Sequence, residues 1–551
     1  MRDADLRRLA AGAVRLAGRA GDEAFYAAAC VRSGVLGLEP PGRLARIGAV
    51  LVRHGMIAGA LGAGALRHPD RVAVRDDRGE LTYGQLERRS NALAHAWRAR
   101  GLRAGDGVGL LVRNHAGFLE AAFAAAKCGA KLVALNTAFA PPQVRDVIAR
   151  EGVDLLVADD DLMAALDGLP LRLGAVRAWA QGDDQLHSID SLVAAADPGP
   201  VPRPARPPRV VILTSGTTGA PKGAPRDEPR SLGLIGGLLS RVPLRARETT
   251  VLAVPLFHAF GFLSMVMGLA LGSTLVLRRR FDPEQTLADL AANRASALIV
   301  VPVMLSRILD LGADRVRAQA PSTLRVIFVS GSALGASLAT RALSAFGPVL
   351  YNMYGSTEVA YATVATPRDL AAEPSTVGRP VRGVTVRILD DSGRPLPPGR
   401  TGRIFVANSI QFEAYSDGQT KERIGALMSS GDVGHLDAMG RLFVDGRDDE
   451  MIVSGGENVF PAEVEELLCS HPAIAEAAAV GVADEQFGQR LCAFVVPRPG
   501  ARITEDEVRD HVRENLARYK VPRDVVFLSE LPRNATGKVL KRELRAPAEA
   551  S

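Results

Sequence analysis

The sequence predicts an α/β protein with a large N-terminal domain of parallel-rich αβ layers, a small β subdomain and a small α+β C-terminal domain. Three observations lead there. The 551 residues exceed what one hydrophobic core usually supports. Helical and apolar segments alternate from Leu81 to Arg150, and short strands with turns replace them from Gly383 to Ala407. We place the boundaries at a helical extension over 1–70, a large domain over 71–448 and a C-terminal domain over 449–551.

The first half of the chain has the pattern of βαβ units. Helical periodicity covers residues 83–102 and 117–130, and short apolar runs lie at 108–112 and 132–136. A proline-rich linker, Pro198–Arg209, then leads into an apolar strand that begins at Val210. Further strands are expected at 297–302 and 324–331. This alternation predicts a parallel sheet with helices on its faces.

The second half ends in a self-contained pattern. Residues 461–470 and 505–516 have helical patterning, and the patterns of residues 477–483 and 491–497 predict strands. Together with a basic tail they predict a separate domain of roughly a hundred residues.

One uncharged run, Val251–Leu277, is long enough to suggest a membrane span. Pro255, His258 and the turn at Gly272 interrupt it, so we expect a buried helix followed by a short strand. The first 21 residues contain Asp3 and Asp5 and do not resemble a secretory signal; they predict an amphipathic helix.

Bulk composition describes an ordinary globular protein, with 47% hydrophobic and 23% charged residues. The formal charge of +6 is spread along the chain, which argues against nucleic-acid binding and suits small anionic substrates. The four cysteines lie far apart and form no metal or disulfide motif, so reduced thiols and a cytoplasmic location are the expectation.

A loop rich in Gly, Ser and Thr follows the strand at Val210. It comprises Thr214, Ser215, Gly216, Thr217, Thr218, Gly219, Ala220, Pro221, Lys222 and Gly223. Its glycines allow close backbone approach, its hydroxyls and amides can donate to phosphate oxygens, and Lys222 adds a cation. Because the lysine lies between proline and glycine, this is not a Walker loop. We expect the loop to bind phosphate.

This loop resembles that of the adenylate-forming superfamily, which includes acyl-CoA synthetases, luciferases and adenylation domains. The similarity extends in the usual motif order from about Leu81 to Leu544. It implies ATP, Mg²⁺ and coenzyme A as cofactors and co-substrates, and a mobile C-terminal domain. The large domain over 71–448 would be the AMP-binding domain.

The resemblance also implies roles for the nucleotide site. In the segment Tyr354, Gly355, Ser356, Thr357 and Glu358, the tyrosine would stack on adenine, the threonine would contact phosphate, and the glutamate would hold magnesium with Thr214. Gly331, Ser332 and Ala333 would form the adenine-edge turn. Asp432 would accept from the ribose hydroxyls, and Arg447 would contact ribose and phosphate.

The C-terminal domain would move during the reaction. By resemblance, Lys538 is the catalytic lysine that bridges carboxylate and α-phosphate, and Asp449 is the hinge. Gly455 and Gly456 would form the passage for pantetheine. His258 would gate or orient the acyl group, although a histidine in an apolar run is equally compatible with a core position.

We therefore expect a ligase that forms an acyl-adenylate and then an acyl-CoA thioester, releasing AMP and pyrophosphate. Phe257, Phe260 and Phe262 favour a medium- or long-chain fatty acid as the substrate. Two alternatives stay open: an acyl-AMP ligase that feeds a carrier protein, and a non-catalytic lipid or nucleotide binder or lipid-uptake protein. Contact of the N-terminal extension with a membrane is open, and oligomeric state is not predicted.

Overall fold

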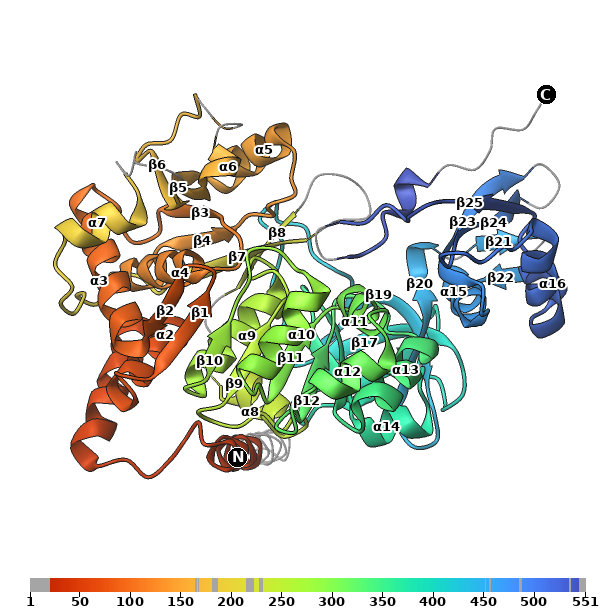
Figure 1. The fold of residues 1–551 in the computed structure, drawn as a ribbon, viewed down its shortest axis with the longest axis horizontal. Helices are drawn as coiled ribbons and strands as arrows, with labels where there is room; N and C mark the ends of the chain where they lie inside the picture. The colour runs from red at the N-terminus through yellow and green to blue at the C-terminus, as the bar shows by residue number, and fades with distance from the viewer. Residues whose placement is uncertain are drawn as a thin grey trace, which may run out of the picture.

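The computed structural model describes residues 20–163, 166, 168–180, 187–214, 222–226, 231–450, 452–454, 457–484, 488–534 and 537–544. The described strands form four sheets with helices packed on them (Figure 1), which confirms the predicted α/β class. Most of the amphipathic helix expected over residues 1–21 lies outside the described residues.

The first sheet has the order β6-β5-β3-β4-β7-β8. Its pairs are parallel except β7 with β8, as the βαβ pattern predicted. The strands are β3 (Gly107–Leu111), β4 (Lys131–Ala134), β5 (Val153–Asp159), β6 (Ala175–Trp179), β7 (Arg209–Thr214) and β8 (Lys222–Arg226). The helices of this part are α3 (Tyr83–Ala99), α4 (Ala116–Cys128), α5 (Pro141–Glu151), α6 (Asp160–Met163) and α7 (Ile189–Ala195).

The second sheet has the order β15-β14-β13-β12-β11-β9-β10-β1-β2, parallel in its centre and antiparallel at both edges. Its strands are β1 (Val72–Asp76), β2 (Gly79–Thr82), β9 (Thr249–Leu252), β10 (Thr274–Val276), β11 (Ala297–Val300), β12 (Val326–Val329), β13 (Leu350–Ser356), β14 (Ala360–Ala365) and β15 (Arg379–Pro380). Its helices are α8 (Gly233–Leu239), α9 (Ala259–Ala270), α10 (Pro283–Ala292), α11 (Pro302–Leu309), α12 (Ala313–Gln319), α13 (Ala336–Phe346) and α14 (Pro367–Ala372).

Two smaller sheets complete the molecule. The antiparallel subdomain contains β16 (Thr385–Leu389), β17 (Gly402–Ala407), β18 (Arg423–Ile424), β19 (Leu427–Leu436) and β20 (Leu442–Arg447). The C-terminal sheet contains β21 (Ile452–Ser454), β22 (Glu457–Val459), β23 (Ile474–Asp484), β24 (Gly488–Pro497) and β25 (Asp524–Phe527). Its helices and 3₁₀ turns are η2 (Asp448–Glu450), α15 (Pro461–Ser470), α16 (Glu505–Asn515), η3 (Arg518–Lys520) and η4 (Lys541–Glu543).

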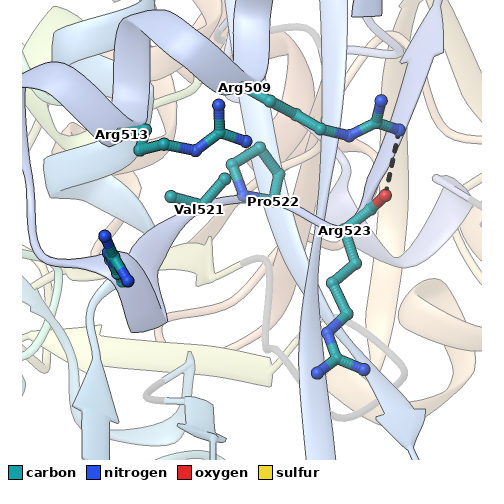
Figure 2. A pocket seen from close by; sticks show the side chains of 6 residues that line it. Arg509, Arg513, Val521, Pro522 and Arg523 are labelled. Atoms are coloured by element: carbon teal, nitrogen blue, oxygen red, sulfur yellow. Dashed lines mark hydrogen bonds between the residues drawn. The ribbon is translucent and has the colours of Figure 1, made fainter. Parts of the chain in front are cut away.

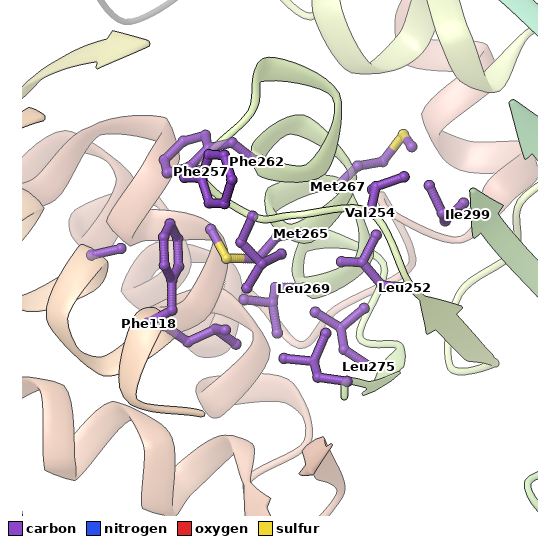
Figure 3. Packing of buried hydrophobic residues seen from close by; sticks show 14 of the residues in the cluster. Phe118, Leu252, Val254, Phe257, Phe262, Met265, Met267, Leu269, Leu275 and Ile299 are labelled. Atoms are coloured by element: carbon purple, nitrogen blue, oxygen red, sulfur yellow. The ribbon is translucent and has the colours of Figure 1, made fainter. Parts of the chain in front are cut away.

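The uncharged run Val251–Leu277 forms α9 and β10 inside the largest core, as expected. Met265 and Leu269 of α9 are fully buried and pack beside Leu252 and Leu275 of the second sheet (Figure 3). Hydrophobic burial of this helix by neighbouring elements accounts for its composition without a bilayer.

Two helical segments precede the first strand. One spans residues 20–33, and α2 spans Pro41–Arg67. Among the described residues, α2 is the one helix long and apolar enough to cross a membrane, but 44% of its most apolar window is buried inside the protein. Gly55, at φ +74°, breaks α2 into two halves. α2 packs on α3, α4 and α9, and most of its buried residues lie in the second half.

Trp179 at the end of β6 lies between two arginines. The guanidinium carbons of Arg78 and Arg279 are 3.9 Å and 4.5 Å from its ring centroid. The ring of His115 meets it edge-on with centroids 4.9 Å apart. This cation–π arrangement ties β6 to the second sheet through Arg279.

Candidate functional site

The predicted phosphate loop joins β7 to β8. Thr214 and Lys222 are register partners in the antiparallel β7–β8 pair, so the two ends of the loop lie next to each other. Ser215, Gly216, Thr217, Thr218 and Gly219 lie outside the described residues, as does the side chain of Thr214. Their predicted contacts with phosphate, and that of Thr214 with magnesium, stay predictions.

Lys222 is described, and its ammonium group faces the segment that connects β17 to β18. Its Nζ donates to Oε1 of Gln419 and lies 3.7 Å from Oδ2 of Asp417 and 5.4 Å from the ring centroid of Tyr415. Ser416 ties this segment to β8, because its backbone N–H donates to the carbonyl of Gly223 at 2.9 Å. The ammonium group of Lys222 is therefore held against the side chains of Tyr415, Asp417 and Gln419.

Glu358 also contacts this segment, through Tyr415. It lies in the turn between β13 and β14, beside Thr357, and is 9% exposed. The hydroxyl of Tyr415 donates to Oε1 of Glu358 at 2.6 Å. Burial and this hydrogen bond to a carboxylate raise the pKa of Tyr415, so it stays a donor. Tyr415 thus connects the loop lysine to the predicted metal-binding carboxylate.

A glycine is required at the end of β13. A Cβ on Gly355 would lie 2.0 Å from the carbonyl oxygen of Ala360, across the hairpin. The two strands approach this closely because no side chain separates them. Gly355 and Ser356 therefore set the position of the turn that carries Thr357 and Glu358.

Asp432 is the centre of a second group. Its Oδ2 accepts from the hydroxyl of Tyr354 at 2.5 Å, and its Oδ1 accepts from Nη1 of Arg447 at 3.0 Å. Asp432 and Arg447 are register partners on β19 and β20, and the backbone N–H of Asp432 donates to Ser430 Oγ at 3.1 Å. Burial, reinforced by Asp432, raises the pKa of Tyr354 well above its usual range.

The two groups lie side by side. Tyr354, which donates to Asp432, and Glu358, which accepts from Tyr415, lie four residues apart at the end of β13 and in the turn that follows it. Lys222, Glu358, Tyr354, Asp432 and Arg447, which span more than two hundred residues, thereby meet at one place. The fold therefore brings together these five residues, which the sequence predicted for the nucleotide site.

A single carboxylate can suit magnesium here. Among the described residues, no three His, Cys, Asp or Glu side chains are grouped to hold a metal alone. Mg²⁺ commonly uses one or two protein carboxylates and takes its other oxygens from phosphate and water. The constrained carboxylate of Glu358 fits that requirement.

The predicted adenine-edge turn follows β12. Gly331 has φ +101°, and Ser330 donates its hydroxyl to the carbonyl of Met353 at 2.9 Å, which links this turn to β13. A Cβ on Gly331 would lie 3.2 Å from Cγ1 of Val301. Gly331, Ser332 and Ala333 thus lie at the carboxyl end of a parallel strand, where open α/β sheets bind ligands.

The turn that carries Lys538 docks on the same valine. A Cβ on Gly537 would lie 2.2 Å from Cγ1 of Val303 and 3.7 Å from Cγ2 of Val301. Lys538 donates its backbone N–H to Oδ1 of Asn534 at 2.9 Å and accepts from the backbone N–H of Asn534 at 2.9 Å. Val301 therefore lies beside both the C-terminal turn and the adenine-edge turn.

His258 precedes α9 at its N-cap position. Its Nε2 is buried and has no hydrogen-bond partner among the described residues. Burial lowers the pKa of His258 to about 3, so the ring is neutral at physiological pH. It packs on Phe257, with ring centroids 4.5 Å apart.

The three predicted wall phenylalanines separate into two environments. Phe257 and Phe262 are buried core residues near Phe118 and Met265 (Figure 3). Phe260 is partly exposed and meets Phe328 of β12 edge-on, with centroids 5.2 Å apart. Of the three, Phe260 is the one that keeps accessible surface near the site.

The C-terminal domain adds a basic pocket. It has a volume of about 550 Å³ and is lined by Arg509, Arg513, Arg518, Val521, Pro522 and Arg523 (Figure 2). Nη2 of Arg509 donates to the carbonyl of Arg523 at 3.0 Å. The pocket borders η3, which contacts β22. The predicted pantetheine residues Gly455 and Gly456, just before β22, lie outside the described residues.

Sequence reasoning missed Tyr415, Asp417 and Gln419. They lie in an irregular segment between strands, and neither periodicity nor a charge pattern marks them. Their contacts with Lys222 and Glu358 arise only when this segment packs on β8 and on the β13–β14 turn. The basic pocket was missed as well, because its arginines are dispersed over residues 509–523.

Comparisons with known proteins agree with this arrangement. Residues 62–416 match the family described as AMP-binding enzyme, and residues 463–538 match the AMP-binding enzyme C-terminal domain. An indoleacetate–CoA ligase of Aromatoleum aromaticum is 33% identical over 492 residues, covering 87% of this chain and 95% of that protein. The fatty acid–[acyl-carrier-protein] ligase ScoC of Streptomyces coeruleorubidus is 30% identical over 499 residues, covering 87% of this chain and 94% of that protein.

A solved structure has the same fold. It is o-succinylbenzoate CoA synthetase (MenE) from Bacillus subtilis in complex with the acyl-adenylate intermediate OSB-AMP. The two chains share 26% identity with a TM-score of 0.76, over 89% of this chain and 98% of that one.

Proposed function

Because the chain belongs to the AMP-binding enzyme family, we propose that it is an AMP-forming acid–thiol ligase that joins an apolar carboxylic acid to coenzyme A. The observation that carries this proposal is the docking of the Lys538 turn on Val301 and Val303, next to the Gly331 turn. This docking supports delivery of a cation, the ammonium group of Lys538, to the nucleotide site.

In the first half-reaction, a carboxylate oxygen attacks the α-phosphorus of ATP. The new P–O bond gives acyl-AMP, and the α–β bond breaks to release pyrophosphate. Lys538 supplies charge to the attacking carboxylate and the α-phosphate, Lys222 binds the phosphates, and Asp432 accepts from the ribose hydroxyls. Each preorganised contact of this kind is worth about 3 to 4 kcal/mol in the transition state.

Magnesium, held by Glu358 and Thr214, would neutralise phosphate charge in this step. Tyr415 orients the Glu358 carboxylate through its 2.6 Å hydrogen bond. Tyr354 stacks on adenine, while Thr357 and Ser356 donate to the phosphate. These assignments rest on the family resemblance and on the clustering of the described side chains.

In the second half-reaction, the thiol of coenzyme A attacks the acyl carbonyl, and AMP leaves. Gly455 and Gly456 line the path of the pantetheine arm. The arginine pocket near η3 supports a nucleotide-bearing acceptor, because guanidinium groups bind phosphate oxygens well. A carrier protein as the acceptor is the competing possibility, since the relative ScoC is named for such an acceptor.

For the acid, we propose a medium- or long-chain fatty acid. Phe260 and Val303, both partly exposed, supply apolar surface near the site, and the neutral His258 adds no charge there. A second candidate is an aryl acid, which the relative named for indoleacetate favours. Each buried methylene contributes about 0.8 kcal/mol, so a panel of acids separates these classes by kcat/KM.

The test is pyrophosphate release over a panel of fatty, aryl and short acids, with and without coenzyme A. We expect release to depend on the acid and thioester to form with coenzyme A. Lys538→Ala should slow release by about 100-fold or more. Lys520→Ala is the control, because Lys520 belongs to the same domain and pairs with Glu463. Full-rate release by Lys538→Ala, or activity without any acid preference, would refute the proposal.

A further inference from the structure

The N-terminal segment outside the family match contains an exposed apolar surface. Eight large hydrophobic residues are exposed in the part of the chain that the structure describes, and four of them lie between residues 31 and 52. These four are Val31, Leu38, Leu44 and Val52. Residues 20–33, the connector and α2 run along one edge of the molecule (Figure 1, lower left). A concentration of this kind usually marks an interaction site.

The first half of α2 has an exposed face of apolar and small residues. Leu44, Gly48 and Val52 recur every four residues and form a stripe with Ala45 and Ala49, all of them exposed. Leu44 is 57% exposed and Val52 is 70% exposed. Ordinary helical surfaces of globular proteins are polar at such positions. We call these five residues the α2 stripe.

The opposite face is fixed to the protein. A Cβ on Gly59 would lie 2.7 Å from Cδ2 of Leu51, and one on Gly62 would lie 2.6 Å from Cγ1 of Val50. The first half of α2 therefore folds back on the second half at Gly55, and Ile47 is buried. This contact holds the α2 stripe outward.

Arginines border the α2 stripe. In the fully described stretch 31–53, every exposed charged side chain is an arginine: Arg32, Arg46 and Arg53. The acidic residue, Glu39, is only partly exposed and is paired with Arg43 at 3.3 Å and Arg67 at 3.0 Å. An apolar stripe with a basic border suits the interface of an anionic lipid bilayer.

We propose that residues 31–53 form a peripheral docking surface for an anionic bilayer. The α2 stripe enters the headgroup region, and Arg46 and Arg53 contact lipid phosphates. The surface lies on the membrane and does not span it: only the thirteen residues from Pro41 to Arg53 precede the break and bear the stripe, and a span needs about 20 residues. The second half of α2 is largely buried in the protein, so it is not available to a membrane.

A second copy of the chain fits this surface poorly. A two-fold interface would bring the Arg46 and Arg53 border near its own copy. The α2 stripe also has only two large apolar side chains, whereas a stable interface buries about 800 Å² per partner. The charge and the size of the surface therefore favour lipid.

The test is co-sedimentation of the full chain with phosphatidylcholine vesicles, alone or with about 30% phosphatidylglycerol. We expect binding to the anionic vesicles, weakened by salt. The pairs Leu44→Glu with Val52→Glu, and Arg46→Glu with Arg53→Glu, should each reduce binding by about tenfold or more. Ile424→Glu with Met439→Glu, which charges two exposed apolar residues elsewhere, is the matched control and should bind normally.

Three results would overturn the proposal: no binding to anionic vesicles, equal binding by the stripe variants, or a wild-type dimer that the stripe variants convert to a monomer. Folding of each variant is checked by its thermal midpoint and by turnover of a water-soluble acid. Neither pair belongs to the catalytic machinery, so turnover tests the ligase function separately from membrane docking.

Discussion

Asp432 is engaged by protein donors on both of its carboxylate oxygens. Tyr354 donates one hydrogen bond to Oδ2, and Arg447 donates one to Oδ1. A carboxylate has about four acceptor positions, so two remain for the hydrogen bonds that we propose from the ribose hydroxyls, without breaking the existing bonds. The side chain is thus oriented before the nucleotide arrives.

Replacing that carboxylate tests its role. Asp432→Asn keeps the size of the side chain but loses the charge, and hydrogen bonds to charged groups are worth about 1.5 to 3 kcal/mol. We expect KM for ATP to rise by about ten- to a hundredfold in pyrophosphate-release assays. Asp445→Asn, on the neighbouring strand β20, is the control. Equal effects of both changes would contradict the assignment.

The partly exposed His258, whose Nε2 is buried, makes stability depend on pH. Burial lowers its pKa to about 3 from an ordinary 6.5. Between these values the unfolded chain binds a proton that the folded protein does not, so the free energy of unfolding falls as the pH drops below 6.5. From pH 7 to pH 5, this one group should cost about 2 kcal/mol.

Urea denaturation of the wild type and of His258→Phe at both pH values measures this cost. The wild type should lose about 2 kcal/mol more than the variant, because the two chains share every other titrating group. Identical losses would show that the imidazole is solvated.

At the residue scale, sequence resemblance assigned roles that the fold makes compatible. Lys222, Glu358, Tyr354, Asp432 and Arg447 were all predicted for one site, and the structure gathers them. Tyr415 could not be predicted, because its two partners come from different sheets and only tertiary packing selects it. Phe257 and Phe262 are as apolar as Phe260, so composition alone could not separate core from site.

At the element scale, periodicity predicted α3, β3, α4 and β4 in the large domain and α15, β23, β24 and α16 in the C-terminal domain, but other elements, β8 among them, escaped it. This edge strand begins at Lys222 and contains Gly223 and Pro225, which are poor strand formers. An edge strand tolerates proline because one side of its backbone needs no partner. Pairing with β7, rather than local preference, makes these residues a strand.

The Lys538 turn depends on a glycine in the left-handed region. Gly537→Ala places a methyl 2.2 Å from Cγ1 of Val303 at φ +77°. We expect pyrophosphate release to fall by about tenfold or more, because the turn can no longer dock. Thioester formation from supplied acyl-AMP should change by less than about twofold.

The matched control is Gly500→Ala. Gly500 has φ +78° in the same domain, but no atom lies within 4 Å of the position that a methyl group would take there, so this change reproduces the backbone strain without the clash. Adding Val303→Ala to Gly537→Ala should restore part of the rate. No difference between the two glycine variants would rule out docking as the cause.

At the whole-molecule scale, the described residues of the C-terminal domain contact the large domain at a few points. Glu466 of α15 accepts from the backbone N–H of Ala336 at 2.9 Å, and the Lys538 turn touches Val301 and Val303. Because the contacts are few, the C-terminal domain can reorient at a small cost in free energy. The boundary at residue 449, which the change of sequence pattern predicted, and the hinge role of Asp449, which the resemblance implied, both stay predictions.

Asp449→Pro tests the hinge. Residue 449 lies within η2, and residues of a 3₁₀-helix generally have φ values near that of proline, so the described arrangement should tolerate the change. Fixing φ should block rotation. We expect pyrophosphate release within about threefold of wild type and thioester formation lowered by about 100-fold. Equal loss of both half-reactions would locate the defect outside the hinge.

The arginine-flanked Trp179 has a practical consequence for spectroscopy. The chain has two tryptophans, and the other, Trp97, is 1% exposed in α3. Both indoles therefore belong to the region built on the first sheet, and none lies beyond residue 179. Tryptophan emission will follow the melting of that region alone, so a C-terminal lobe that unfolds first would leave the tryptophan fluorescence unchanged while far-UV dichroism declines.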